Sequence, residues 1–438
     1  MSVDLTPSLL DRARGALLGQ LVGDALGTTL EFQSAASILK RYPNGLRDVI
    51  GGGPFKVLPG QVTDDSELAL GLARSLAGAG DYDADAVAGA YVAWYRSEPF
   101  DVGGTIGQAF RGATPTGAGA AATVLARANH ASQANGALMR VAPLAIWGWT
   151  LAPARLAALA AFDARLSHPH PACQDANVAY THAIALALRE RLPAEEVHAR
   201  TLAFAGERDL DPDVVAVLED AAAGPPADYV ANMGWYRIAL QNAFHQLLAA
   251  PSFEEGLVAT VAAGGDTDTN GCIAGALLGA VHGEERIPAR WRQVVLACRT
   301  DRGADYQARD ARELAEALAA AGARPAAQQG GALPVAGVAT PLVDDDDVDL
   351  LAETGLHAAF PVDGFDDDDV LSPTDFADEV RQDEPQDATV GAAPQGAASE
   401  DAVFVDEVPD EPGLDDTSEI AWADETDGER PGVEAPDR

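Results

Sequence analysis

The chain has 438 residues and a formal net charge of −39, and its acidic excess is uneven because 32 of its 68 Asp and Glu residues lie between 341 and 438. This length allows one large domain or two, with ample residues for a core. The acidic composition lacks the basic footprint of a nucleic-acid-binding protein, and no apolar run is long enough to span a membrane, so we expect neither nucleic acid nor membrane as a partner.

The first residues do not look like a secretory leader, since they lack a basic stretch followed by an unbroken apolar run. The three cysteines, Cys173, Cys272 and Cys298, are scattered along the chain. Their spacing indicates neither a disulfide framework nor a cysteine-ligated zinc site. We therefore expect a reduced, cytoplasmic protein that acts as a monomer.

Apolar residues recur at helical spacing over most of residues 1–322. Near the start the pattern is formed by Leu9, Ala13, Leu17 and Leu21, and "EEVHARTLAFA" and "WYRIALQNAFHQLLAA" continue it. Runs of alternating β-branched residues are nearly absent. The many alanines permit close packing of helices. The pattern predicts a compact all-α domain of about a dozen or more helices, with functional residues on the loops between them.

A change of composition marks the end of this domain. The Pro-, Gly- and Gln-rich stretch "GARPAAQQGGALPVAG" begins at residue 322, and acidic runs such as "DDDDVDL" and "DGFDDDDV" follow it. Such a sequence cannot bury enough apolar surface to offset its conformational entropy. We therefore predict a folded domain over 1–322 and a disordered acidic tail rich in Pro, Gly and Ala over 323–438. We interpret the tail as a solubilising extension, and binding to a basic partner is the alternative.

Three junctions between a loop and a helix carry acidic residues among Gly and Thr. The first, "LVGDALGTTLEF" (21–32), ends a helix at Gly27 and places Glu31 just beyond it. The second is "GQVTDDSELAL" (60–70), and the third is "GGDTDTNGCIAGALLGA" (264–280). In the second junction Thr63 is a predicted N-cap, and Asp64 and Asp65 follow it in the first turn of the helix. In the third junction Asp266 and Asp268 lie where the helix begins.

The paired aspartates have two explanations. Aspartate near a helix N-terminus complements the helix dipole, and this structural explanation suffices for a single pair. Two pairs of adjacent like charges are unfavourable unless a cation lies among them, and carboxylate and hydroxyl oxygens suit Mg²⁺ or Mn²⁺. The four or five carboxylates exceed what one such ion needs. Two bridged ions are therefore the more natural interpretation.

The motifs, taken together and in their order, resemble those of the ADP-ribosylglycohydrolases, the family of dinitrogenase reductase-activating glycohydrolase and the ADP-ribosylarginine hydrolases. The resemblance runs from about residue 10 to about residue 300 and excludes the tail. It rests on "GALLGQLVGDALGTTLEF", "TDDSELAL", "FDVGGT", "NGALMR", "SHPHP" and "GGDTDTNGCIAGALLGA".

This resemblance implies an all-helical fold with a dinuclear Mg²⁺ or Mn²⁺ centre in a cleft, and an enzyme that removes ADP-ribose from modified protein side chains. Glu31 matches a flexible-loop glutamate that gates the cleft in some members and approaches the second metal. Its alternative is an ordinary exposed carboxylate. The implied metal ligands are Thr63, Asp64, Asp65, Asp266, Asp268 and Thr269.

The expected chemistry agrees with these ligands. Cleavage at the anomeric carbon builds positive charge on the ribose, while water must be oriented and the leaving group protonated. Metal ions can hold the ribose hydroxyls and a water in one geometry, and carboxylates stabilise the developing charge. We predict that Asp65 and Asp266 are catalytic ligands that also orient or deprotonate this water, with no choice between them. Glu31 is the third predicted catalytic residue.

Three further motifs resemble substrate-binding segments. In "FDVGGT", Asp101 keeps the carboxylate that can face an arginine guanidinium, although Gly104 replaces the family's common Asn and so removes an amide that contacts substrate. "NGALMR" offers Asn135 and Gly136 as hydrogen-bond donors to the diphosphate or ribose, with a helix cap as the alternative. His168 in "SHPHP" resembles a pocket histidine and is otherwise a loop residue.

We therefore favour a metal-dependent hydrolase of ADP-ribosylated protein, acting on the N-glycosidic bond of ADP-ribosyl-arginine. Serine-linked and small-molecule ADP-ribose conjugates are alternative substrates. A non-catalytic regulator that binds ADP-ribose would lack the ligand set that is present here. A metal-dependent phosphohydrolase would commonly add metal-binding histidines, and the sequence has no such pair.

Overall fold

The computed structural model describes residues 5–79, 81–114 and 119–323. Within these ranges the chain forms sixteen α-helices and three short 3₁₀ helices. The β-type pairing in these ranges consists of isolated bridges, without named strands. The predicted all-α class is confirmed. The last described helix ends at Gly322. The end of the domain at residue 322 stays a prediction. The predicted tail lies, apart from Ala323, outside the described residues.

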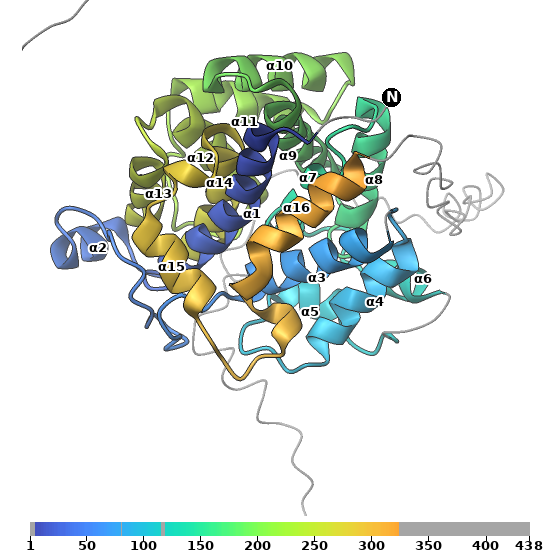
Figure 1. Cartoon of the computed structure of the whole chain (residues 1–438), viewed down its shortest axis with the longest axis horizontal. Helices are drawn as coiled ribbons and strands as arrows, with labels where there is room; N and C mark the ends of the chain where they lie inside the picture. Colours follow the sequence, from blue (N-terminus) through green and yellow to red (C-terminus); the bar gives the residue numbers. More distant parts are fainter. Residues whose placement is uncertain (1–4, 80, 115–118, 324–438) are drawn as a thin grey trace, which may run out of the picture. The chain divides into compact units, whose positions relative to one another are not determined.

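Many of the helices follow one another with short connections, while longer segments join α2 to α3 (42–63) and α6 to α7 (126–141) (Figure 1). Proline occupies the first position of α1, α8, α9 and α11, where its φ is already helical and its missing amide hydrogen is not needed. The helices before residue 150 are α1 (Pro7–Gly27), α2 (Ala35–Arg41), α3 (Asp64–Ala79), α4 (Ala84–Tyr95), α5 (Gly104–Phe110), α6 (Ala120–Leu125) and α7 (Ala142–Trp147). The others are α8 (Pro153–Arg165), α9 (Pro171–Glu190), α10 (Ala194–Glu207), α11 (Pro212–Ala223), α12 (Tyr236–Ala249), α13 (Phe253–Ala262), α14 (Thr267–His282), η1 (Glu284–Arg286), α15 (Ala289–Ala297), η2 (Ala304–Tyr306), η3 (Ala308–Asp310) and α16 (Ala311–Gly322).

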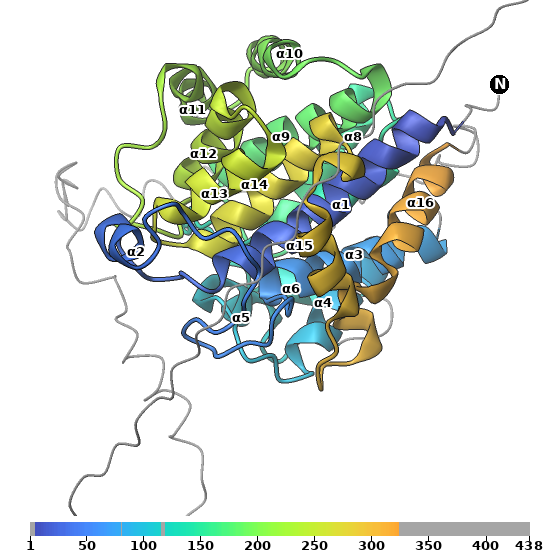
Figure 2. The same cartoon turned by 60° about the vertical axis from the view of Figure 1, so that its left-hand side comes forward.

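Helices α1 and α14 lie side by side through the middle of the described helices (Figures 1 and 2). Both carry glycine at every fourth position, which places the glycines on one face. They are Gly15, Gly19, Gly23 and Gly27 in α1, and Gly271, Gly275 and Gly279 in α14. A Cβ atom added to any of them would lie less than 3.0 Å from backbone of the other helix. The two backbones are therefore in direct contact, which only residues without a side chain allow.

The order of these contacts shows that the two helices are antiparallel, because Gly15 lies against Gly279 and Gly23 lies against Gly271. The C-terminal end of α1 therefore lies beside the N-terminal end of α14. Residues 15–31 are buried without exception, so α1 is enclosed on all sides. Neither this helix nor any other described one is long and apolar enough to cross a membrane.

Two groups of helices surround this central pair. Helices α12 and α13 pack against α14, while α3 contacts α4, α7, α16 and η2. Figure 2 shows α3 and α4 on the opposite side of α1 from α12 and α13. The predicted metal ligands lie where α3 and α14 begin, at the C-terminal end of α1.

We expect Gly19→Ala to lower the free energy of unfolding by about 1–3 kcal/mol, because the new Cβ would collide with the Gly275 carbonyl and separate the central helices. Gly71→Ala in α3 is the matched control, since its Cβ would meet only the Ala90 Cβ at 4.0 Å. This control should be neutral or should stabilise by up to about 1 kcal/mol. Urea unfolding compares the two, and equal stabilities would contradict the close-contact explanation.

Candidate metal centre

Asp24 lies near the C-terminal end of α1 and is completely buried. Its Oδ1 and Oδ2 each accept the Thr63 backbone amide at 3.1 Å, and Oδ2 also accepts the Ser66 amide at 3.2 Å. Amides at the start of a helix have no partner within the helix, so Asp24 caps α3 from another part of the chain. Burial nevertheless raises the pKa of Asp24 to about 6.

The first turn of α3 carries two predicted metal ligands. Asp64 and Asp65 are buried, and Thr63 directly precedes the helix, as predicted. Thr63 Oγ1 lies 3.1 Å from Asp24 Oδ1 and 3.2 Å from Asp65 Oδ2. The other oxygen of Asp65, Oδ1, is buried without a hydrogen-bond partner. The aspartate pair therefore points into a space lined by oxygen atoms.

The beginning of α14 carries the other predicted ligands. Asp266 precedes the helix as its N-cap residue, and Asp268 lies in its first turn. The Thr269 backbone amide donates to Asp268 Oδ1 at 2.9 Å. The Thr269 side chain lies close to Asp65 and Asp266 and lowers the pKa of both carboxyls against the larger effect of burial. Thr269 thus connects the ligand residues of α3 and α14.

A double-glycine turn joins α14 to the segment that carries Glu31. Gly264 and Gly265 have φ angles of 80° and 75°, which favour glycine. The Phe32 amide donates to the Gly265 carbonyl, and the Gly265 amide donates to the Gln33 carbonyl, each at 2.9 Å. Glu31 is only 7% exposed, so the alternative that it is an exposed loop carboxylate is wrong.

Asp101 joins the same group from the loop between α4 and α5. One carboxylate oxygen from each of Glu31, Asp101 and Asp268 lies within 4.8 Å of the others. Burial, together with the charge of Asp266, raises the pKa of Asp101 to about 7. We predicted that Asp101 faces the substrate, and the structure places its carboxylate among the predicted ligands as well.

Seven carboxylates therefore meet at this point, which we call the carboxylate cluster: Asp24, Glu31, Asp64, Asp65, Asp101, Asp266 and Asp268. Burial raises the pKa of all seven. Repulsion between neighbours adds to this rise at Glu31, Asp64, Asp65, Asp101 and Asp268. Among the described residues, no Arg, Lys or His forms an ion pair with any of them.

The carboxylate cluster fits divalent cations. Glu31 Oε2 and Asp65 Oδ1 are buried oxygens without hydrogen-bond partners, and such groups are costly unless something compensates them. The donors are carboxylate and hydroxyl oxygens, the atoms that Mg²⁺ and Mn²⁺ prefer. The number of carboxylates exceeds the need of one ion, which favours a two-metal arrangement.

Asn135 contacts the carboxylate cluster directly. Its side-chain Nδ2 donates to Asp266 Oδ2 at 2.7 Å, and its backbone amide donates to the Gly234 carbonyl at 2.8 Å. We predicted a donor to the diphosphate or ribose. In the structure one side-chain hydrogen is donated to Asp266 and the backbone hydrogen to the Gly234 carbonyl. Only the second side-chain hydrogen of Asn135 is left for a ligand. Met139 of the same motif is buried in the core.

His168 lies against Gly136, because a Cβ on this glycine would be 3.0 Å from His168 Cε1. Arg140 Nη1 donates to Ser167 Oγ at 2.6 Å, and Ser167 Oγ shares a hydrogen bond with His168 Nδ1 at 2.8 Å. Burial and the charge of Arg140 lower the pKa of His168 to about 3. The ring is therefore neutral. His168 is a buried residue of the loop between α8 and α9.

Gly104, which replaces the family's common Asn, begins α5. A Cβ at this position would meet no atom within 4 Å. The backbone therefore leaves room for a side chain here, and the glycine opens space near Asp101.

The sequence patterns missed two residues of this site. Asp24 could have been found as a lone acidic residue within the apolar run of α1. Asn270 follows Asp266 by one helical turn, and both polar atoms of its buried side chain lack hydrogen-bond partners. It stands in the same "DTDTN" run as the predicted ligands. Nothing in that run indicated that the asparagine side chain would be buried.

The chain is similar to solved and curated proteins. A structure of an ADP-ribosylglycohydrolase-related protein complex matches with a TM-score of 0.60 and 30% identity, covering 72% of this chain and all of that chain. The ADP-ribosyl-[dinitrogen reductase] glycohydrolase of Rhodospirillum rubrum is 34% identical over 295 residues, which are 65% of this chain and 90% of that protein. The ADP-ribosylarginine hydrolase Tri1 of Pseudomonas putida (strain GB-1) is 29% identical over 299 residues, 66% of this chain and 76% of that protein.

The profile of the ADP-ribosylglycohydrolase family matches residues 5–328. This range contains every described helix, from α1 to α16, and the whole carboxylate cluster. The chain therefore belongs to the ADP-ribosylglycohydrolases, a family of enzymes.

Proposed function

We propose that the protein hydrolyses the glycosidic bond between ADP-ribose and a modified protein side chain, with two divalent cations, Mg²⁺ or Mn²⁺, at the carboxylate cluster. The observation that carries this proposal is the pair of buried, unpartnered oxygens, Glu31 Oε2 and Asp65 Oδ1, among seven carboxylates without a cationic partner in the described chain. The activity named for the relatives supports the proposal.

The residues that would hold the cations come from the starts of α3 and α14: Thr63, Asp64, Asp65, Asp266, Asp268 and Thr269. When bound, divalent cations supply positive charge that orients water and ribose hydroxyls and lowers the pKa of water. Asp101 and Glu31 lie beside Asp268 and would complete the surroundings of the ions.

The carboxylates differ in what they can still accept. Asp266 Oδ2 already accepts a hydrogen bond from Asn135, whereas Asp65 Oδ1 accepts none. We assign the removal of the proton from the attacking water to Asp65 and the orientation of this water to Asp266. We assign the exchange of a proton with the leaving group to Glu31, whose Oε2 is also without a partner.

Two donors lie next to the carboxylate cluster and suit the sugar and diphosphate. The neutral His168 ring lies beside Gly136 and is a donor when its proton is on Nε2, and Asn135 retains one amide hydrogen. Both would donate to oxygens of ADP-ribose, which carries hydroxyl and phosphate acceptors. Because Asn135 also holds Asp266, it would couple the position of the substrate to that of a predicted ligand.

Arginine is the modified side chain that we propose. The Asp101 carboxylate can accept two hydrogen bonds from a guanidinium, a pairing that a serine linkage does not offer. A similar protein named as an ADP-ribosylarginine hydrolase supports this choice. Serine-linked ADP-ribose is the second candidate, because the open space at Gly104 would admit a different leaving group.

Removing the metal with EDTA should abolish hydrolysis, and Asp65→Asn or Asp266→Asn should do the same, because each substitution removes a charge and a hard ligand. The metal-free variants should unfold at or above the temperature of the metal-free wild type, since one repelling charge is gone.

Asp213→Asn is the control for these variants, because Asp213 is an exposed aspartate in the first turn of another helix, α11. It should keep wild-type turnover with Mn²⁺. Activity assays and thermal unfolding check both sets. Turnover by rigorously metal-free protein would contradict the proposal.

The metal-free protein should become less stable as the pH rises from 5 to 8. The pKa of Asp24 is raised to about 6 and that of Asp101 to about 7, so both stabilise the fold while protonated. This contribution is complete below about pH 4 and is lost as the pH rises through these values.

Differential scanning calorimetry in EDTA measures this slope. Asp101→Asn should make the slope shallower, and saturating Mn²⁺ should remove most of it. A slope that Mn²⁺ leaves unchanged would show that the carboxylate cluster is not its origin.

At saturating Mn²⁺, Asp101→Ala should lower kcat/KM for ADP-ribosyl-arginine by about ten- to a hundredfold, because a charge-assisted hydrogen bond is lost. An ADP-ribosyl-serine substrate should be affected much less. Equal losses on both substrates would mean that Asp101 acts only within the carboxylate cluster. Faster cleavage of the serine conjugate by the wild type would show that the arginine assignment is wrong.

A further inference from the structure

Arg302 lies between α15 and α16, and its guanidinium makes four hydrogen bonds. Nε donates to Glu67 Oε1 and Nη2 donates to Glu67 Oε2, each at 2.8 Å. Nη1 donates to the Ser97 carbonyl, and Nη2 also donates to Ser97 Oγ, again at 2.8 Å each. The guanidinium lies over the Tyr306 ring, 5.1 Å from its centre. One arginine thus joins three segments that are far apart in the sequence.

The first of these segments is the turn that carries the aspartate pair. Glu67 follows Asp65 by two residues, and its amide donates to the Thr63 carbonyl at 3.0 Å to begin the hydrogen bonding of α3. Glu67 is 1% exposed, and Trp94 Nε1 also donates to its Oε2 at 2.8 Å. A buried carboxylate held by a two-pronged guanidinium has little freedom to move. Arg302 therefore fixes the first turn of α3.

The second segment is the loop between α4 and α5. Ser97 begins this loop and precedes Asp101 by four residues. Ser97 Oγ donates to the Trp94 carbonyl at 2.6 Å while it accepts from Arg302. The same guanidinium thus holds the base of the loop that brings Asp101 to the carboxylate cluster.

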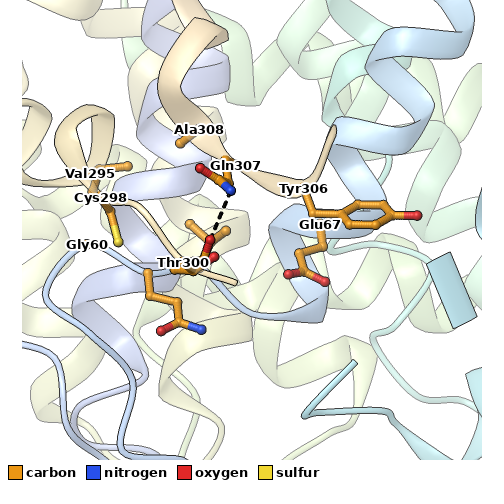
Figure 3. A pocket seen from close by; sticks show the side chains of 10 residues that line it. Gly60, Glu67, Val295, Cys298, Thr300, Tyr306, Gln307 and Ala308 are labelled. Carbon is orange, nitrogen blue, oxygen red and sulfur yellow. Dashed lines mark hydrogen bonds between the residues drawn. The ribbon is translucent and has the colours of Figure 1, made fainter. Parts of the chain in front are cut away.

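The space beside these contacts is too small for a substrate. Figure 3 shows Glu67 and Tyr306 on one side of a cavity of about 10 Å³, with Gln307 and Thr300 on the other. This volume is close to the minimum for a single water molecule. The Glu67–Arg302 contact therefore belongs to no separate ligand site, and its effect falls on the two segments that it joins.

A second ion pair connects the segment between α15 and α16 to α3, at a point on α3 farther from the predicted metal ligands. Arg74 Nη1 and Nη2 donate to Asp310 Oδ2 and Oδ1, each at 2.8 Å. Arg74 follows Asp65 by nine residues, or roughly 13 Å along the helix. This ion pair joins the same two parts of the fold without touching the turn that carries Asp65.

We propose that Arg302 is a positioning residue for the metal centre: through Glu67 and Ser97 it holds the first turn of α3 and the Asp101 loop at the separation that two cations require. The inference rests on the metal centre of the proposed function. Groups that orient metal ligands typically change metal affinity by about 10- to 100-fold when they are replaced.

The test is the affinity of the full-length protein for Mn²⁺, measured by isothermal titration calorimetry and by electron paramagnetic resonance of free Mn²⁺. Arg302→Gln should raise the Kd by about tenfold or more. Arg302→Lys keeps the positive charge but loses the bidentate geometry of the guanidinium, so it should raise the Kd severalfold. This variant provides the test if Arg302→Gln does not fold. Arg74→Gln is the matched control and should bind Mn²⁺ as the wild type does.

The outcomes separate the two proposals. Absence of Mn²⁺ binding by the wild type would overturn the metal centre itself. Tight binding by the wild type, with the same affinity in folded Arg302→Gln and Arg302→Lys, would overturn the positioning role alone. An equal loss of affinity in Arg74→Gln and Arg302→Gln would also overturn it, because a general loosening of the segment would then explain both.

Discussion

The direct contact between the backbones of α1 and α14 is the constraint on which the rest of the structure depends. Glycine at every fourth position removes the side chains that would hold the two helices apart, and it fixes their register because a shift would drive a Cβ into the opposite backbone. The antiparallel arrangement then places the end of α1 beside the start of α14. Asp24 at that end caps α3, so three helix ends meet and their carboxylates are brought together.

This arrangement works against folding as long as no cation is present. The carboxylate cluster consists of six buried carboxylates and the half-buried Asp101, all with raised pKa values. Because neighbouring carboxylates repel one another, the scaffold has to be held by interactions that do not depend on their charge. The glycine contacts and the backbone hydrogen bonds between Gly265 and the segment after Glu31 are of this kind. The N-terminal ends of α3 and α14 add favourable helix dipoles at the aspartates, a smaller contribution.

The groups that surround the carboxylates matter as much as the carboxylates themselves. Asn135 holds Asp266, Thr269 joins α3 to α14, and Arg302 connects the first turn of α3 to the loop of Asp101. A site that must keep two cations and a water in one geometry needs such support, because small displacements weaken both metal binding and the reaction. Arg302 lies just beyond the sequence motifs that indicated the function, so these motifs did not predict a role for it.

The sequence by itself determined the all-α class and the positions at which α1 ends and α3 and α14 begin, because helical periodicity and capping are local properties of the chain. It also determined the chemical type of the predicted ligands, since hard oxygen donors are visible as residue types. It did not show that Asp24 caps α3, that Asp101 lies beside Glu31 and Asp268, or that His168 lies against Gly136. Only the tertiary structure decided these relations. The glycine spacing in α1 permits close contact but does not name the partner helix, and distances between remote residues depend on which helix faces meet.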